Sequence, residues 1–145
     1  MFRHILLPTD GSELATSAVE KGIALAKALG ARVTVLTVLE RFHLMTLNPT
    51  QLEESLATYQ RHASEHAAKV LGEAEAKAAA AGVAFDQLTR TGESPWEEIN
   101  EVAAEIGADL IAMASHGRRG LSALMLGSQT ARVVAQSKVP VLVFR

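Results

Sequence analysis

The 145-residue chain contains no cysteine. This absence excludes disulfide frameworks, thiolate zinc sites and cysteine nucleophiles. Aromatic residues are scarce, at 4%, and every purely apolar stretch is far shorter than the ~18 residues that span a membrane. Aliphatic packing must therefore hold the fold, and the length predicts a single domain over residues 1–145.

The chain also lacks an excess of basic residues. Its 14 Lys and Arg residues are balanced by 16 Asp and Glu residues, which gives a net charge of -2. Such a composition does not supply the positive charge that neutralises many phosphates of a nucleic acid, so we expect no nucleic-acid partner. The first residues lead into an apolar segment without the pattern of a signal peptide. These features predict a cytoplasmic protein with no membrane partner.

The hydrophobic pattern alternates between segments typical of strands and segments typical of helices. Short aliphatic and β-branched runs predict strands at residues 4–8, 33–39, 83–90, 109–114 and 139–144. Apolar residues at helical spacing predict helices at about 12–29, 50–81, 95–106 and 128–137, with a further helical turn at 121–126. Three of these helices are followed by a glycine of the kind that ends helices, namely Gly30, Gly82 and Gly107.

Two predicted helix starts have the spacing of a capping box. Thr50 stands three residues before Glu53, and Ser94 stands three residues before Glu97. In this arrangement the hydroxyl and the carboxylate each accept a backbone N–H that the helix leaves unpaired. Pro95 fits the first helical position, where its missing N–H costs nothing.

Strands separated by helices predict a parallel sheet with right-handed crossovers. Strands that are almost continuously apolar are covered on both faces. The predicted fold is therefore α/β, an open five-stranded parallel sheet with helices on both faces, similar to a Rossmann fold. Ligands of such sheets bind beyond the carboxyl ends of the strands, which here are Pro8, Leu39, Arg90 and Ala114.

The connection after the first strand carries a carboxylate, in the sequence Pro8-Thr9-Asp10. A carboxylate at this edge is suited to accept hydrogen bonds from ribose hydroxyls. A turn in which Asp10 or Ser12 caps the next helix explains the same residues. Both interpretations stay open at this point.

Glycine and hydroxyl residues gather after the fourth strand. Gly127 precedes a helix that opens at Ser128, and a helix N-terminus offers unpaired N–H groups and a positive dipole end to an anion. Gly117 lets the backbone approach phosphate oxygens, and Ser128 and Thr130 add hydroxyl donors. The alternative is a pair of turn glycines before an ordinary serine N-cap. The motifs GxxxxGK[ST] and GxGxxG are both absent.

Two histidines, His62 and His66, are four residues apart on the predicted second long helix. Their order does not match HExxH, in which a glutamate directly follows the first histidine. His43 adds no ligand at a suitable spacing. The sequence therefore predicts no zinc site.

Together, residues 8–12, 115–121, 126–128 and 139–143 resemble the universal stress protein family, and the resemblance extends over the whole chain. ATP-binding members of that family carry G-x2-G-x9-G-[ST]. The corresponding positions here are Ala114, Gly117, Gly127 and Ser128, so alanine replaces the first glycine. An alanine with negative φ is tolerated there, whereas positive φ costs about 1 kcal/mol or more. The resemblance implies the ATP-binding branch and the strand order 3-2-1-4-5.

The resemblance also implies a nucleotide site. Asp10 would bind the ribose, Val38 the adenine, and the glycine-containing segments the phosphates of ATP, which would carry Mg²⁺ with them. The implied nucleotide-binding residues are Pro8, Thr9, Asp10, Val38, Met113, Ala114, His116, Gly117, Gly127, Ser128, Gln129 and Thr130.

The function that follows is an ATP-binding, nucleotide-dependent switch in a stress response, with little or no ATP turnover and no catalytic residue. The resemblance further implies a homodimer formed through the last strand, which begins at Val139 and ends at Phe144. Two alternatives stay open. One is a slow ATPase or self-phosphorylating enzyme that uses Glu40 or His116, with Ser122 or Ser128 as acceptor. The other is a dimeric interaction module that binds no nucleotide.

Overall fold

A computed structural model describes residues 1–42, 48–117 and 125–145, and it contains a five-stranded parallel sheet in the order β3-β2-β1-β4-β5. The strands are β1 (His4–Pro8), β2 (Arg32–Glu40), β3 (Phe85–Gly92), β4 (Leu110–Ala114) and β5 (Val141–Phe144). The predicted fold class and strand order are confirmed. The predicted helical turn at 121–126 lies largely outside the described residues.

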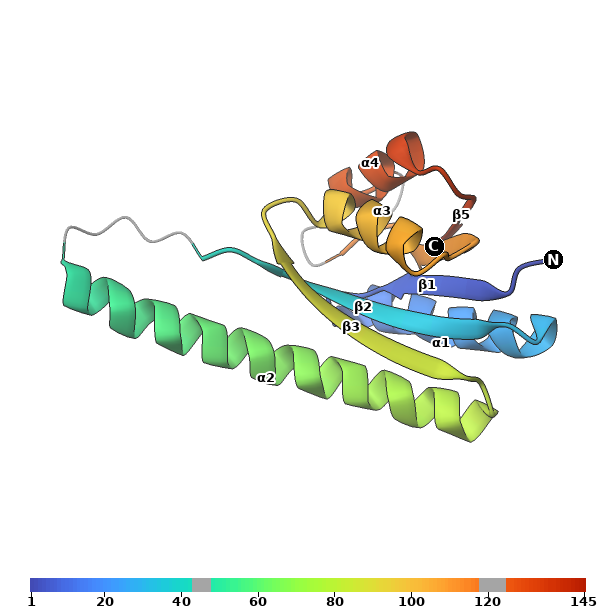
Figure 1. Ribbon diagram of the computed structural model, residues 1–145, viewed down its shortest axis with the longest axis horizontal. Helices are drawn as coiled ribbons and strands as arrows, with labels where there is room; N and C mark the ends of the chain where they lie inside the picture. The colour runs from blue at the N-terminus through green and yellow to red at the C-terminus, as the bar shows by residue number, and fades with distance from the viewer. Residues whose placement is uncertain (43–47, 118–124) are drawn as a thin grey trace.

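Helices cover both faces of the sheet. They are α1 (Glu13–Leu29), α2 (Pro49–Ala81), α3 (Pro95–Glu105) and α4 (Ser128–Gln136). Figure 1 shows α1 and α2 on one face and α3 and α4 on the other. The strands run so that their carboxyl ends point toward the N-terminal half of α2, which extends beyond the edge of the sheet.

Each face of the sheet has its own aliphatic core. Successive residues of a strand point to opposite faces, so Leu7 packs toward α1 and α2 while Leu6 packs toward α3 and α4. Both side chains are fully buried. Ile111 in β4 joins Leu6, together with Val102 of α3 and Val133 of α4. The continuous apolar strands therefore fill two cores, as the sequence predicted.

The start of α2 differs from the prediction. Asn48 is the N-cap, because its side-chain oxygen accepts the N–H groups of Thr50 at 3.1 Å and Gln51 at 3.3 Å. Pro49 then occupies the first helical position, where proline is favoured. The capping box predicted at Thr50 and Glu53 is wrong, since the helix has already begun before Thr50.

Two strands begin two residues later than predicted. The N–H of Val83 donates to the carbonyl of Ala78 at 2.9 Å and closes the C-terminus of α2, so β3 begins at Phe85. The N–H of Val139 donates to the Ser137 hydroxyl at 3.2 Å in a local turn, so β5 begins at Val141. In both cases the first residues of the apolar run are used by the preceding turn.

Polar groups tie the amino edge of the sheet together. The Asp109 carboxylate accepts the N–H groups of Arg3 at 2.9 Å and His4 at 3.0 Å. The buried His4 ring has its Nε2 2.7 Å from the Thr34 hydroxyl oxygen. Burial lowers the pKa of His4, and the nearby charge of Arg32 lowers it further. Burial raises the pKa of Asp109, but the N–H groups of His4 and Arg3 outweigh this and leave it lowered.

The His4 environment predicts a pH dependence of stability. As the pH falls below about 6.5, the unfolded chain protonates its His4 before the folded chain does, so the free energy of unfolding decreases. We expect His4→Gln to make urea denaturation midpoints at pH 7 and pH 5 more similar than in the wild type. The lowered pKa of Asp109 acts in the same direction, but only below about pH 4. An undiminished difference between pH 7 and pH 5 in His4→Gln contradicts this assignment.

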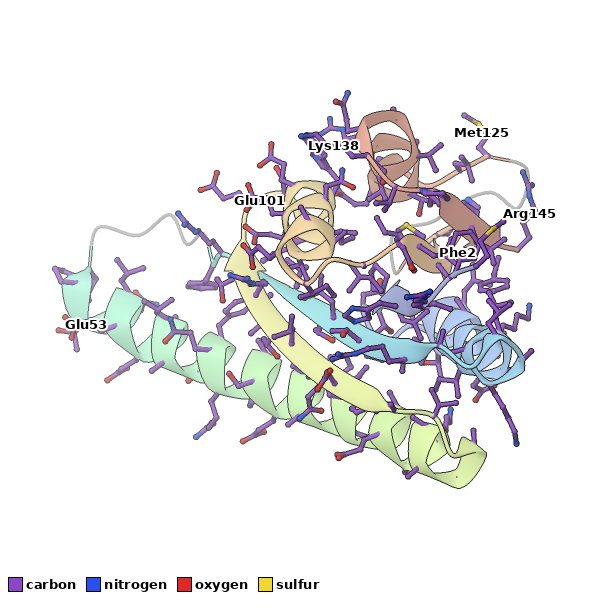
Figure 2. The ribbon with its side chains drawn as sticks, turned by 45° about the vertical axis from the view of Figure 1, so that its right-hand side comes forward. Phe2, Glu53, Glu101, Met125, Lys138 and Arg145 are labelled. Atoms are coloured by element: carbon purple, nitrogen blue, oxygen red, sulfur yellow. The ribbon has the colours of Figure 1, made fainter. Side chains whose placement is uncertain are left out.

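The 33-residue helix α2 is the longest element of the fold. No helix in the described ranges has a stretch long and apolar enough to cross a membrane, α2 included. Figure 2 shows Glu53 near the free end of this helix, pointing away from the sheet. The apolar side chains of the C-terminal half, among them Leu71, Ala74 and Ala78, pack on the sheet. The helix is thus anchored at one end and overhangs the carboxyl edge of the sheet at the other.

Candidate functional site

A cleft of about 530 Å³ lies at the carboxyl ends of β1, β2 and β4. This volume is in the range of small-molecule sites. One wall comes from the overhanging half of α2, and the opposite wall comes from the starts of α3 and α4. The cleft is lined by all twelve residues that the sequence singled out, which are Pro8, Thr9, Asp10, Val38, Met113, Ala114, His116, Gly117, Gly127, Ser128, Gln129 and Thr130.

The turn between β1 and α1 orients a carboxylate at the cleft. Asp10 Oδ1 accepts the N–H of Ser12 at 3.0 Å, and the Ser12 hydroxyl accepts the N–H of Ala15 at 3.3 Å as the N-cap of α1. The N–H of Gly11 donates to the Thr9 hydroxyl at 3.2 Å. The capping interpretation is therefore confirmed, and the same bonds set the direction of the Asp10 carboxylate.

The carboxylate of Asp10 also reaches the loop after β4. A Cβ atom on Gly117 would overlap Asp10 Oδ2, so the carboxylate occupies the space that any other residue would fill. Gly117 does not have a positive φ. Glycine here leaves room for the Asp10 carboxylate and is not required by the backbone conformation. The segments after β1 and β4 thus meet at one point in the cleft.

The start of α4 lines the cleft. Gly127 is the N-cap and makes no side-chain cap, and Ser128 is the first helical residue, so the interpretation of Ser128 as an N-cap is wrong. The first N–H groups of a helix have no partner within it. Ser128, Gln129 and Thr130 line the cleft, and the unpaired N–H groups and the dipole at such a helix start favour a negatively charged ligand.

Some groups at this end already have partners within the protein. The N–H of Gly127 donates to the carbonyl of Ser115 at 2.8 Å, and the hydroxyl of Thr130 donates to the carbonyl of Ala114 at 2.9 Å. Both bonds hold the start of α4 against the end of β4. The Thr130 hydroxyl and the Gly127 N–H are therefore already hydrogen-bonded and are not available to a ligand anion. Gly127 contributes to the cleft by leaving space, because it has no side chain.

Gln129 has a structural contact that the sequence did not indicate. Its side-chain oxygen accepts the N–H of Trp96 in the first turn of α3 at 3.1 Å. The hydroxyl of Ser94 makes no cap hydrogen bond, although Ser94 is the N-cap residue of that helix. The capping box predicted at Ser94 and Glu97 is therefore wrong, because a side chain from α4 caps α3 instead.

Ala114 fits its position without strain. No non-glycine residue in the described part of the chain has a positive φ, and Ala114 has ordinary strand geometry at the end of β4. Its methyl group packs with Ala15 and Ala18 of α1. Ala114 is therefore accommodated at the end of β4, where it is one of the residues that line the cleft.

An apolar surface lines the part of the cleft on the α3 side. Val38 and Met113 belong to the core that packs on α3 and α4, with Met113 buried and Val38 half-buried. Nearby, His116 Nδ1 lies 2.9 Å from the hydroxyl oxygen of Ser115. This combination of an apolar surface, a carboxylate and a helix N-terminus suits a ligand with a flat apolar part, a hydroxylated part and an anionic part.

The contribution of α2 to the cleft was not predicted from the sequence. Tyr59, His62, Ala63 and His66 line the cleft and are spaced so that they share one face of the helix. The Tyr59 hydroxyl donates to the carbonyl of Glu40 at 2.9 Å, and its ring stacks on Phe42 with a centroid distance of 4.8 Å. The helical spacing of these four residues was visible in the sequence. The sequence pattern did not show, however, that α2 packs over the cleft.

The protein side chains do not form a metal site of their own in the described ranges. No group of three or more His, Asp or Glu side chains there is arranged so that it could hold a metal ion. His62 and His66 both line the cleft.

Ser122, one of the residues considered as a phosphate acceptor, lies outside the described residues.

Comparisons with known proteins agree on one family. The model of the universal stress protein family matches residues 1–145. A curated universal stress protein from Thermus aquaticus is 37% identical over 145 residues, which cover all of both chains.

Solved structures also have this fold. The structure of protein MJ0577 of Methanocaldococcus jannaschii superposes with a TM-score of 0.82 at 30% identity, and the match covers 99% of this chain and 95% of that one. A crystal structure of a universal stress protein in complex with cAMP has a TM-score of 0.73 at 23% identity, covering 99% of this chain and 97% of that one. At that identity the second match supports the fold alone.

Proposed function

Since the chain belongs to the universal stress protein family, we propose that its cleft binds ATP and that the protein acts as a nucleotide-dependent switch in a stress response. The observation that carries this proposal is the gathering of the twelve implied residues around one cleft. An adenine nucleotide combines a flat base, a hydroxylated sugar and an anionic part, which fit the apolar surface, the carboxylate and the helix N-terminus of the cleft.

The chemistry of the cleft supports one orientation of the nucleotide. The Asp10 carboxylate is suited to the ribose hydroxyls, and the apolar surface at Val38 and Met113 is suited to the adenine. The N–H groups at the start of α4 are suited to the phosphates. Mg²⁺ would arrive with the phosphates and complete the neutralisation of their charge.

We also propose that the protein hydrolyses ATP slowly or not at all. Phosphoryl transfer requires a positioned nucleophile and charge compensation at the transferred group. Asp10 is oriented by Ser12 and faces Gly117, on the ribose side of the proposed orientation. The switch would act by ordering the cleft around the nucleotide. We also propose that residues 1–145 form a single domain and that the protein is cytoplasmic.

Isothermal titration calorimetry with ATP and Mg²⁺ tests the proposal. We expect saturable binding with a Kd below about 1 mM, a common range for small-molecule ligands. A freshly purified sample should also release adenine nucleotide on heating, measured by absorbance and chromatography. Absence of binding at millimolar ATP overturns the proposal and favours an interaction module without nucleotide. Rapid phosphate release that is lost in His116→Ala favours the enzymatic alternative.

We further propose that two copies associate through β5. This strand is at an edge of the sheet, paired with β4 on its inner side. Its Leu142 side chain is 36% exposed. An exposed apolar edge strand is prone to pair with another chain. A dimer in sedimentation velocity that becomes a monomer in Leu142→Lys would support this association.

A further inference from the structure

One side chain of α2 touches the turn that carries the ribose-side carboxylate. His66 Nε2 lies 3.3 Å from the main-chain oxygen of Asp10, 56 residues away in the sequence. With its proton on Nε2, the ring donates a hydrogen bond to this carbonyl. His66 is otherwise exposed. Its side chain therefore contributes to the turn and the cleft rather than to either core.

The same turn is shaped to receive α2. Gly11 has a φ of +77° and no side chain. A Cβ atom there would lie 2.7 Å from His66 Nε2 and 2.6 Å from Val70 Cγ2, both closer than packed atoms approach. His66 and Val70 are one helical turn apart, so α2 packs directly on the backbone at Gly11. Contacts with α2 therefore help to set the position of the turn at Gly11.

The turn at residues 10–12 also orients the Asp10 carboxylate. Asp10 Oδ1 accepts the N–H of Ser12, so any shift of the main chain at residues 10–12 moves the carboxylate. Its other oxygen lies directly against Gly117. A contact that holds the Asp10 carbonyl therefore also holds the group that faces the ligand.

We propose that His66 is a positioning residue for ribose recognition, which holds the Asp10 main chain so that the carboxylate meets the ribose hydroxyls. This inference rests on the proposed nucleotide function and deepens it. It assigns to α2 a part in selecting nucleotides whose ribose carries both free hydroxyls. His66 acts through Asp10 and need not contact the nucleotide.

The test compares ATP with 2′,3′-dideoxy-ATP, each with Mg²⁺, by calorimetry on the full chain. We expect the wild type to prefer ATP by about tenfold or more, since hydrogen bonds to a charged group are lost in the dideoxy compound. His66→Ala should weaken ATP binding by about five- to tenfold and change dideoxy-ATP binding by less than about twofold. His66→Gln retains an N–H donor at a similar distance and should restore most of the preference.

Two further variants make the result specific. Lys69→Ala removes an exposed side chain of the same helix that does not line the cleft, and it should keep the ratio of the two affinities near the wild-type ratio. In the background of Asp10→Ala, His66→Ala should have no further effect on that ratio, because the carboxylate that it positions is gone.

The outcomes separate this inference from the proposed function. If the wild type binds neither nucleotide, the proposed function fails and the inference falls with it. If the wild type prefers ATP and His66→Ala leaves the preference unchanged, or weakens both ligands equally, the function stands and the positioning role is rejected. Thermal unfolding of each variant shows whether a lost affinity reflects a lost fold.

Discussion

Replacing Gly117 by alanine is expected to weaken ATP binding about 10- to 100-fold, because a charge-assisted contact of about 1.5–3 kcal/mol is disturbed. The added methyl group would overlap Asp10 Oδ2. The carboxylate must then move away from its position, and the ribose loses its acceptor. Gly117 has no positive φ, so alanine introduces no backbone strain. Calorimetry with ATP and Mg²⁺ measures the change.

Gly72→Ala is the matched control for this substitution. Gly72 is an exposed residue inside α2, and a Cβ atom there would meet nothing within 4 Å. We expect unchanged ATP affinity and a gain of about 0.5–1 kcal/mol in the free energy of unfolding. If Gly117→Ala binds ATP as tightly as Gly72→Ala does, the Asp10 carboxylate has no part in binding at its present position.

The same chemical change at Gly22 is expected to reduce the free energy of unfolding by about 1–3 kcal/mol. Gly22 is buried in α1, and a Cβ atom there would overlap Leu7 Cδ2 and lie 3.1 Å from Cδ1. The side chain of Leu7 in β1 is fully buried in the core under α1, so it has no open space into which to move. Urea denaturation of Gly22→Ala measures the loss.

A double mutant tests whether Leu7 is the cause of that loss. Leu7→Ala alone should destabilise the fold by about 2–5 kcal/mol, because it leaves a cavity. The methyl group of Gly22→Ala would occupy part of that cavity. The double variant should therefore be more stable than the sum of the single changes predicts, by about 1 kcal/mol. Additive losses would place the strain elsewhere in α1.

The contrast between Gly72 and Gly22 shows where sequence reasoning reaches its limit. Both are glycines inside helices, and helix propensity predicts the same gain from alanine at each. Only the packing of α1 against β1 distinguishes them, because it brings Leu7 onto Gly22. A similar limit applies at Ser94, whose sequence predicted a capping box. Its hydroxyl makes no cap hydrogen bond, and the side chain of Gln129 from a later helix accepts the N–H of Trp96 instead.

The order of strands and helices and the coverage of both sheet faces were accessible from the sequence pattern, whereas the twelve residues around the cleft were implied by the resemblance to the family. Strand and helix periodicity are local properties, and the carboxyl ends of parallel strands necessarily meet at one edge. The role of α2 was decided only by the tertiary structure. Contacts such as that between His66 and Asp10 join residues 56 apart, and they depend on how a long helix packs, which local patterns do not determine.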